Sequence, residues 1–162
     1  KCVLMKRKVR LSIFSSIITV GCFAVFIAIF VVVPQGWFFC FYGIVVVGVS
    51  LLGLYYSPMS VRVTDTAIEV VRSLQIKEFL LADVKEVRLY SPTIGIVRIC
   101  GSGGFMGYWG WFWERELGRY FAYYGKASDC FLVLLKDGRK YLLGCQDAPE
   151  MVEAICGRMQ AV

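Results

Sequence analysis

The stretch LSIFSSIITVGCFAVFIAIFVVV, residues 11–33, decides the class of this protein, and WFFCFYGIVVVGVSLLGLYY, residues 37–56, follows it closely. Neither stretch contains a charged side chain. Helices of these lengths would be roughly 34 Å and 30 Å long, and the hydrocarbon core of a bilayer is about 30 Å thick. Pro34-Gln35-Gly36 between them is a turn signal. We therefore expect a transmembrane helix hairpin, with helices over 11–33 and 37–56.

Small side chains along both stretches favour close packing of the two helices. They are Ser12, Ser15, Ser16 and Thr19 in the first stretch, and Gly43, Gly48, Ser50 and Gly53 in the second. The alternative for the first stretch is a signal peptide, whose apolar region is about 7–15 residues long and ends at a small-residue cleavage site. Residues 11–33 form a longer run that ends in three valines, so we expect this segment to be retained.

The net charge of +6 is concentrated at the start of the chain. Residues 1–10 contain only basic charges, whereas basic and acidic side chains nearly balance in 62–162. Basic residues beside an apolar segment mark the cytoplasmic end of a membrane helix. We expect a multi-pass protein of the cell membrane, with a basic cytoplasmic tail over 1–10 and a cytoplasmic domain over 57–162. The folded part carries no basic excess of the kind that binds nucleic acid.

Residues 57–162 have the size of one domain and read mainly as short strands. The sequence predicts strands over 60–64, 67–71, 76–80, 84–90, 94–100 and 120–124. Phe131 to Leu143 predicts a hairpin, because Asp137-Gly138 between apolar runs is typical of a two-residue turn. That turn would place Cys130 opposite Cys145. A disulfide between them is one alternative, and two small buried side chains in a reducing compartment are the other.

The chain ends in a predicted amphipathic helix. Asp147 stands at its N-cap and Glu150 at its third position, as in an acidic capping box, with Pro149 in the first turn. An apolar stripe for docking on a sheet follows at helical spacing: Ala148, Met151, Val152, Ile155, Cys156 and Met159.

The order of these elements resembles the bacterial pleckstrin-homology-like (PH-like) domains of small membrane proteins. The resemblance covers roughly residues 58–157. It is carried by the glycine-rich run Gly101 to Gly110, by Arg98 before it and Gly118 after it, and by the turn and helix start at 137–138 and 147–150. It implies an α+β, mostly β, domain of about seven antiparallel strands in a two-sheet roll capped by a C-terminal α-helix. It implies no enzymatic activity and no ligand.

The glycine-rich run is also the densest aromatic segment outside the two helices. Its glycines lack the spacing of a nucleotide-binding loop. One interpretation is a connecting loop that packs over the domain, and the other is a contact with the membrane or a partner, because aromatic and arginine side chains favour the bilayer surface. The candidate contact residues are Phe105, Tyr108, Trp109, Trp111, Phe112, Arg115 and Arg119.

Catalytic chemistry has little support in this sequence. The chain has no histidine, the most common general base and metal ligand. Its seven cysteines include no C-x-x-C pair, and Glu114 and Glu116 read as a solvated surface run. We expect no catalytic, cofactor or metal site. The sequence favours a non-enzymatic integral membrane protein whose PH-like domain is a binding or scaffold module for a protein or lipid partner. The protein partner is either a different protein or a second copy of this chain, which would give a homo-oligomer. The alternative is an accessory subunit assembled into a larger membrane complex through its hairpin.

Overall fold

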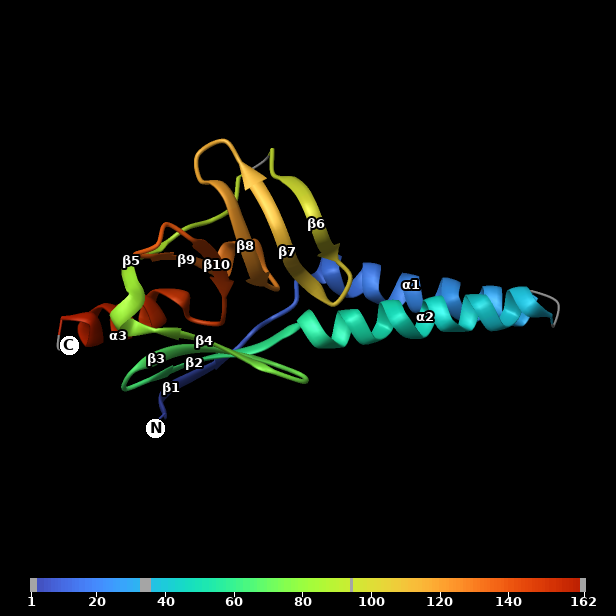
Figure 1. Ribbon diagram of the computed structural model, residues 1–162, viewed down its shortest axis with the longest axis horizontal. Helices are drawn as coiled ribbons and strands as arrows, with labels where there is room; N and C mark the ends of the chain where they lie inside the picture. Colours follow the sequence, from blue (N-terminus) through green and yellow to red (C-terminus); the bar gives the residue numbers. More distant parts are fainter. Residues whose placement is uncertain (1–2, 33–35, 94, 161–162) are drawn as a thin grey trace.

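The computed structural model describes residues 3–32, 36–93 and 95–160, and it contains a sheet domain from which two long helices project (Figure 1). Two short 3-10 turns, Leu81–Asp83 and Ala127–Asp129, lie between strands. In chain order the elements are β1 (Val3–Lys8), α1 (Ile13–Val32), α2 (Trp37–Tyr56), β2 (Pro58–Thr64), β3 (Ala67–Arg72), β4 (Ile76–Leu80), β5 (Val84–Leu89), β6 (Val97–Gly104), β7 (Gly107–Glu114), β8 (Gly118–Tyr124), β9 (Cys130–Leu135), β10 (Lys140–Gly144) and α3 (Ala148–Met159).

The strands form two sheets, in the orders β1-β2-β3-β4 and β5-β9-β10-β8-β7-β6. Two sheets with a C-terminal helix were predicted, and the structure confirms this arrangement. The described part of the chain has ten strands, however, and β8 and β10 pair in parallel. The count exceeds about seven because residues 3–8 supply a strand and because the glycine-rich run splits into β6 and β7.

The main core lies between the sheets and under α3. Val61, Ile68, Phe131 and Leu143 are fully buried there. Helix α3 contributes Ala148, Met151 and Ile155 to the same cluster, as its predicted stripe requires. Burying a side chain of this size contributes roughly 1.5–3 kcal/mol, so the helix is an integral part of the domain.

Within the basic segment 1–10, which was expected to be a cytoplasmic tail, residues 3–8 form an edge strand of the domain. Strand β1 pairs antiparallel with β2, with Lys8 opposite Ser60, and the amide of Val9 donates to the carbonyl of Met59 at 2.9 Å. The helices α1 and α2 are therefore inserted where the turn of a β1–β2 hairpin would be. The tail prediction was wrong because residues 3–8 pair with the open edge of β2 while Lys6 and Lys8 stay in solvent.

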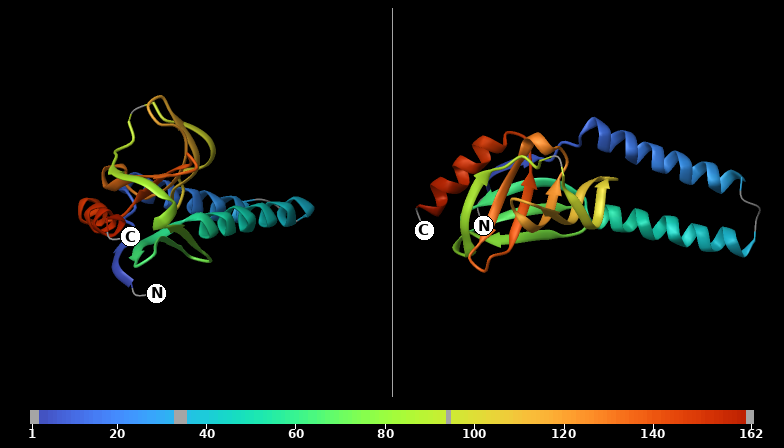
Figure 2. Two further views of the ribbon diagram at one scale, coloured as in Figure 1. Left: turned by 60° about the vertical axis from the view of Figure 1, so that its left-hand side comes forward. Right: turned by 90° about the horizontal axis from the view of Figure 1, so that it is seen from above.

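Helices α1 and α2 agree with the predicted spans to within two residues, and Pro34 and Gln35 of the predicted turn lie outside the described residues. The expected close packing through small residues is absent along most of their described length. Their ring contacts lie near the turn, where Phe30 packs against Phe39 at 4.3 Å. A side-chain carbon added at Gly21 or Gly48 would meet nothing within 4 Å. The helices run apart toward the domain (Figure 2).

The β9–β10 hairpin differs by one residue from the predicted register. The amide of Gly138 donates to the carbonyl of Leu135 at 3.0 Å, and only Gly138 of the turn has positive φ, at 85°. This is a three-residue loop with a bulge rather than a two-residue turn. It places Cys130 opposite Gly144, so Cys130 and Cys145 are not directly paired, and both are buried free thiols.

The start of α3 also differs from the predicted capping box. Asp147 is the N-cap residue, but it has φ 54° and its side chain makes no capping hydrogen bond. Both acidic side chains instead face strand β1. The Arg7 guanidinium lies 3.4 Å from the carboxylate of Asp147 and 2.6 Å from that of Glu150. The two acidic side chains expected to cap α3 therefore form ion pairs with Arg7 of β1, a strand that was not predicted from the sequence.

Candidate functional site

The glycine-rich run is a strand hairpin whose turn is Phe105-Met106. Strands β6 and β7 pair from Val97 opposite Trp113 to Gly104 opposite Gly107. Gly101 and Gly110 face each other with φ of 125° and 122°, and a Cβ on Gly101 would lie 2.2 Å from the Trp109 carbonyl oxygen. Only glycine fits at this crossing. The interpretation as a connecting loop was therefore wrong, because the glycines bend a strand pair.

The tip of this hairpin, residues 104–107, is held against both long helices. The Ser15 hydroxyl of α1 donates to the carbonyl of Gly104 at 2.5 Å and accepts the amide of Gly107 at 3.1 Å. The Thr19 hydroxyl accepts the amide of Met106 at 2.9 Å. These bonds satisfy backbone groups at the hairpin turn, so the tip and α1 form one continuous hydrogen-bonded structure.

Helix α2 completes the socket around the tip. Gly53 is buried, and a Cβ there would lie 2.8 Å from the Phe105 ring and 2.9 Å from the Met106 sulfur. The Ser57 hydroxyl donates to the carbonyl of Met106 at 2.9 Å. The Tyr56 ring stacks on Trp109 at 5.0 Å between centroids. The domain is consequently clamped to the helices.

The seven predicted contact residues divide into separate groups. Phe105 and Trp109 contact the helices directly, whereas Tyr108 stacks on Tyr124 within the sheet at 4.8 Å. Phe112 has an exposed fraction of 3% and belongs to the core, so it cannot contact a partner in this fold. The remaining three lie toward the other end of β7 and β8. Arg119 covers the Trp111 ring at 4.3 Å, and Arg115 is exposed at the turn between the strands.

Several residues at this site were not recognised in the sequence. Ser15, Thr19 and Gly53 were assigned to contacts between the helices, but they bind the hairpin tip instead. Their small size and polar groups indicated that they make close contacts. The neighbouring sequence did not indicate that the contact partner is the hairpin tip. Trp113 and the β6 residues Val97 and Ile99 are 44%, 53% and 51% exposed, so this edge strand presents an apolar surface.

A cleft of about 310 Å³ lies between the helices and β6. Its single cationic residue is Arg98, and no acidic residue lines it. Arg98 lies close to Gly103, where an added Cβ would be 2.7 Å from its Nη1 atom. The lining consists of Cys22 and Phe26 of α1, Val49 and Leu52 of α2, and Arg98, Gly101, Ser102, Phe105 and Trp109. We call this the hairpin cleft.

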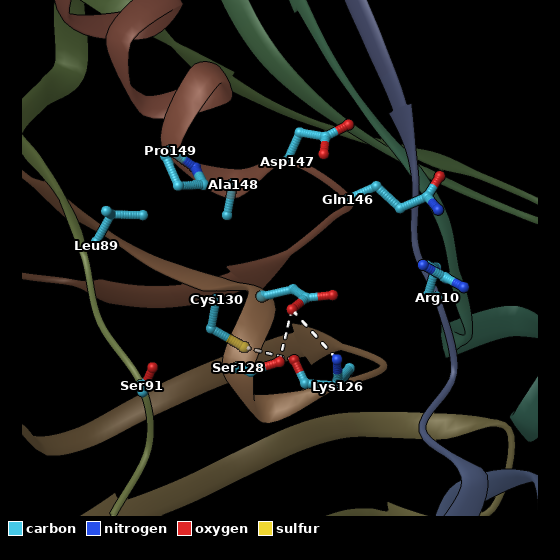
Figure 3. A pocket seen from close by; sticks show the side chains of 11 residues that line it. Arg10, Leu89, Ser91, Lys126, Ser128, Cys130, Gln146, Asp147, Ala148 and Pro149 are labelled. Carbon is cyan, nitrogen blue, oxygen red and sulfur yellow. Dashed lines mark hydrogen bonds and ion pairs between the residues drawn. The ribbon is translucent and has the colours of Figure 1, made fainter.

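A second, polar pocket of about 450 Å³ lies beside the start of α3 (Figure 3). Its charges are mixed, with Arg10 and Lys126 beside Asp129 and Asp147. The Lys126 ammonium lies 3.8 Å from the Asp129 carboxylate. Burial raises the pKa of the Cys130 thiol well above its usual value, so this thiol is protonated and a poor nucleophile. The pocket therefore offers paired charges without an activated group.

Glu114 is buried, which corrects its reading as part of a solvated run. Glu114 is only 2% exposed. Its Oε1 atom accepts hydrogen bonds from the Thr93 amide, at 2.9 Å, and from the Thr93 hydroxyl. Its Oε2 atom and the Tyr120 hydroxyl are buried without a hydrogen-bond partner among the described residues. Burial and the Glu114 carboxylate raise the pKa of Tyr90 to about 12. Glu114 thus fastens the segment before β6 to the sheet.

No three histidine, cysteine or acidic side chains of the described ranges gather closely enough to hold a metal ion. Residues 59–159 match the family model described as a bacterial PH domain. The match begins after both long helices and excludes strand β1. Searches of curated proteins and of solved structures give no match.

Proposed function

The chain belongs to the family of bacterial PH domains, and we propose from that premise that it is a membrane-anchored, non-catalytic binding module. PH domains are generally binding modules without catalytic activity. In this proposal α1 and α2 cross the bilayer, and the domain is held at the cytoplasmic surface. The observation that carries it is the docking of the hairpin tip on both helices.

Membrane insertion is supported by the exposure of the helices. Each is 20 residues long, uncharged and almost unburied, with side chains such as Ile13, Val31 and Trp37 more than 70% exposed. So large an apolar surface requires cover. A signal peptide would be removed after translocation, but here α1 supplies the Ser15 and Thr19 hydroxyls that bind the hairpin tip. This contact supports an anchor that is retained.

The domain's binding surface, in this proposal, is the exposed face at the edge strand β6. Val97 stands opposite Trp113, with Ile99 nearby, and all three side chains are about half exposed. An apolar edge strand can accept an extended segment of another protein through backbone hydrogen bonds. Because the clamp fixes the orientation of the domain, this edge is presented at a constant height above the bilayer.

The test is photo-crosslinking of the full chain in native membranes, preceded by alkaline carbonate extraction. Resistance to extraction is expected for an inserted hairpin. A crosslinker at Val97 or Trp113 should capture a protein, whereas the matched position Glu153, exposed on α3, should not. Release of the chain by carbonate would refute the anchor, and equal capture at all three positions would refute the β6 surface.

The alternative role, an accessory subunit assembled through the hairpin, has its own supporting observation. Gly21 and Gly48 face open space, and such small residues let helices approach one another in lipid. Crosslinkers at these two positions should then capture a membrane protein. Capture there without capture at Val97 would favour the accessory subunit over the binding module.

A further inference from the structure

We propose that the hairpin cleft binds one anionic phospholipid, with an acyl chain between the helices and the phosphate on Arg98. This inference rests on the proposed membrane anchor and names a ligand for it. The cleft opens between two helices that are expected to face lipid, and it is closed on the domain side by β6 and Trp109. Its occupant must therefore be apolar where it meets the helices and anionic where it meets β6.

The apolar part of the site follows from the divergence of the helices. Phe30 and Tyr42 hold α1 and α2 together near their turn, while a Cβ added at Gly21 or Gly48 would meet nothing within 4 Å. Nearer the domain, Cys22 and Phe26 face Val49 and Leu52 across the cleft. Inside a bilayer such a space is filled by hydrocarbon, because water there would find no polar partners.

The depth of the cleft fits a lipid whose headgroup lies near β6. A 20-residue helix is about 30 Å long, which only just spans the hydrocarbon core. Neither helix therefore has length to spare above the bilayer. Phe105 packs against Phe23 at 5.7 Å, and Phe23 lies about 15 Å along α1. The hairpin tip consequently lies beside the middle of α1, and Arg98, at the other end of the β6 strand that leads to the tip, stands nearer the domain side of the bilayer.

Arg98 has the chemistry to select an anionic headgroup. No carboxylate of the described residues forms an ion pair with it, and the cleft contains no acidic side chain. The Ser102 hydroxyl is already engaged with the carbonyl of Phe105 at 2.8 Å. A guanidinium donates paired hydrogen bonds to phosphate oxygens, and this contact strengthens where water is scarce.

Gly103 supplies the space in which this guanidinium lies. Its φ is outside the left-handed region, so its backbone does not require glycine. A Cβ at this position would lie 2.7 Å from Arg98 Nη1. Gly103→Ala should therefore displace the guanidinium while leaving its charge and the fold in place.

The experiment measures lipid retention by native mass spectrometry on the full chain, purified in mild detergent. The protein is offered phosphatidylglycerol and phosphatidylcholine with identical acyl chains. We expect one phosphatidylglycerol to be retained in preference. Arg98→Gln should reduce that preference about tenfold, as expected for loss of a charge-assisted contact. Gly103→Ala should reduce it in the same direction. The matched control is Arg88→Gln, which removes an equal charge from an exposed side chain on β5, 3.8 Å from Glu86.

Three results would overturn the proposal. If Arg98→Gln retains phosphatidylglycerol as well as the parent protein does, Arg98 does not bind the lipid. If Arg88→Gln loses the preference for phosphatidylglycerol as well, the effect is one of overall charge. Displacement of the lipid by glycerol phosphate alone would mean that the cleft does not bind the acyl chain. Each of these results leaves the membrane anchor intact if the chain resists carbonate extraction. Release by carbonate would refute the anchor and this inference together.

Discussion

The hydroxyl of Ser15 lies 2.5 Å from the carbonyl oxygen of Gly104, although 89 positions separate the two residues in the chain. One residue belongs to an apolar helix and the other to the tip of a strand hairpin. Their contact joins the long helix α1 and the sheet domain in one hydrogen-bonded structure.

Ser15→Ala should destabilise the full chain by about 1–3 kcal/mol, because the amide of Gly107 loses its hydroxyl acceptor and the carbonyl of Gly104 keeps only the longer bond from the Thr19 hydroxyl, at 3.4 Å. The control is Ser16→Ala, whose hydroxyl is exposed and donates to the carbonyl of Ser12, just before α1, rather than to the hairpin tip. Thermal unfolding in detergent would measure both variants. Equal melting temperatures would show that the clamp does not depend on Ser15.

The inserted hairpin should be removable if strand β1 is kept. Because the Val9 amide reaches the Met59 carbonyl, replacing residues 10–57 with a four-residue turn should give a soluble, folded domain. A chain beginning at residue 57 lacks β1 and leaves β2 as an open edge, so it should melt roughly 10 °C lower or aggregate. Circular dichroism and size-exclusion chromatography would compare them. Equal stability of the two proteins would mean that β1 contributes little.

Thiol reactivity should follow burial. Burial raises the pKa of Cys145 to about 12, and that of Cys130 is raised by the same cause, whereas Cys100 is exposed on β6. At pH 7.5 a maleimide should therefore modify Cys100 in the folded protein, and Cys130 and Cys145 only after denaturation. Peptide mass spectrometry would identify the sites. Rapid modification of folded Cys130 would contradict this burial.

Cys100 also provides the probe for membrane orientation. The five basic residues before α1 predict that the domain faces the cytoplasm. An impermeant maleimide should then label Cys100 in inverted membrane vesicles and not in intact cells. Labelling from outside intact cells would reverse the orientation. Cys130 and Cys145 cannot serve this purpose, because they should be unreactive from either side.

Alkaline pH should destabilise the domain through Tyr123. Burial raises the pKa of this side chain to about 12, and its exposed fraction is 4%. The unfolded tyrosine ionises near pH 10, so the contribution is complete below about pH 10 and is lost as pH rises through 12. The loss should be on the order of 2–3 kcal/mol. Urea unfolding at pH 9 and pH 11.5 would measure it, and Tyr123→Phe should show a smaller difference between the two.

The local features of the fold were predictable from the sequence where the side chains themselves determine structure. The uncharged stretches give α1 and α2, the short runs of strand-forming residues give β2 to β5, and the apolar stripe from Ala148 to Met159 gives α3. The family resemblance, which a family match over 59–159 supports, added the two-sheet arrangement. These features depend on the periodicity of neighbouring residues, so no distant partner was needed to predict them.

The candidate site depended on contacts between distant segments. Arg7 on β1 reaches Glu150 on α3, and Ser15 reaches Gly104, yet neither pair leaves a local pattern. The register of β9 and β10 was wrong by one residue because the turn takes a bulge at Gly138, which the Asp-Gly signal alone does not distinguish. Two of the seven predicted contact residues, Tyr108 and Phe112, pack within the sheet domain for the same reason.

The sequence by itself determined that two apolar helices precede a strand-rich domain with a docking helix, because composition and periodicity act within each element. Only the tertiary structure decided that the helices are inserted between two paired strands, that Gly53 forms a socket for Phe105, and that Arg98 lies at the mouth of an apolar cleft. Such contacts form when segments far apart in the chain meet, and their energy depends on the geometry of that meeting rather than on the identity of neighbouring residues.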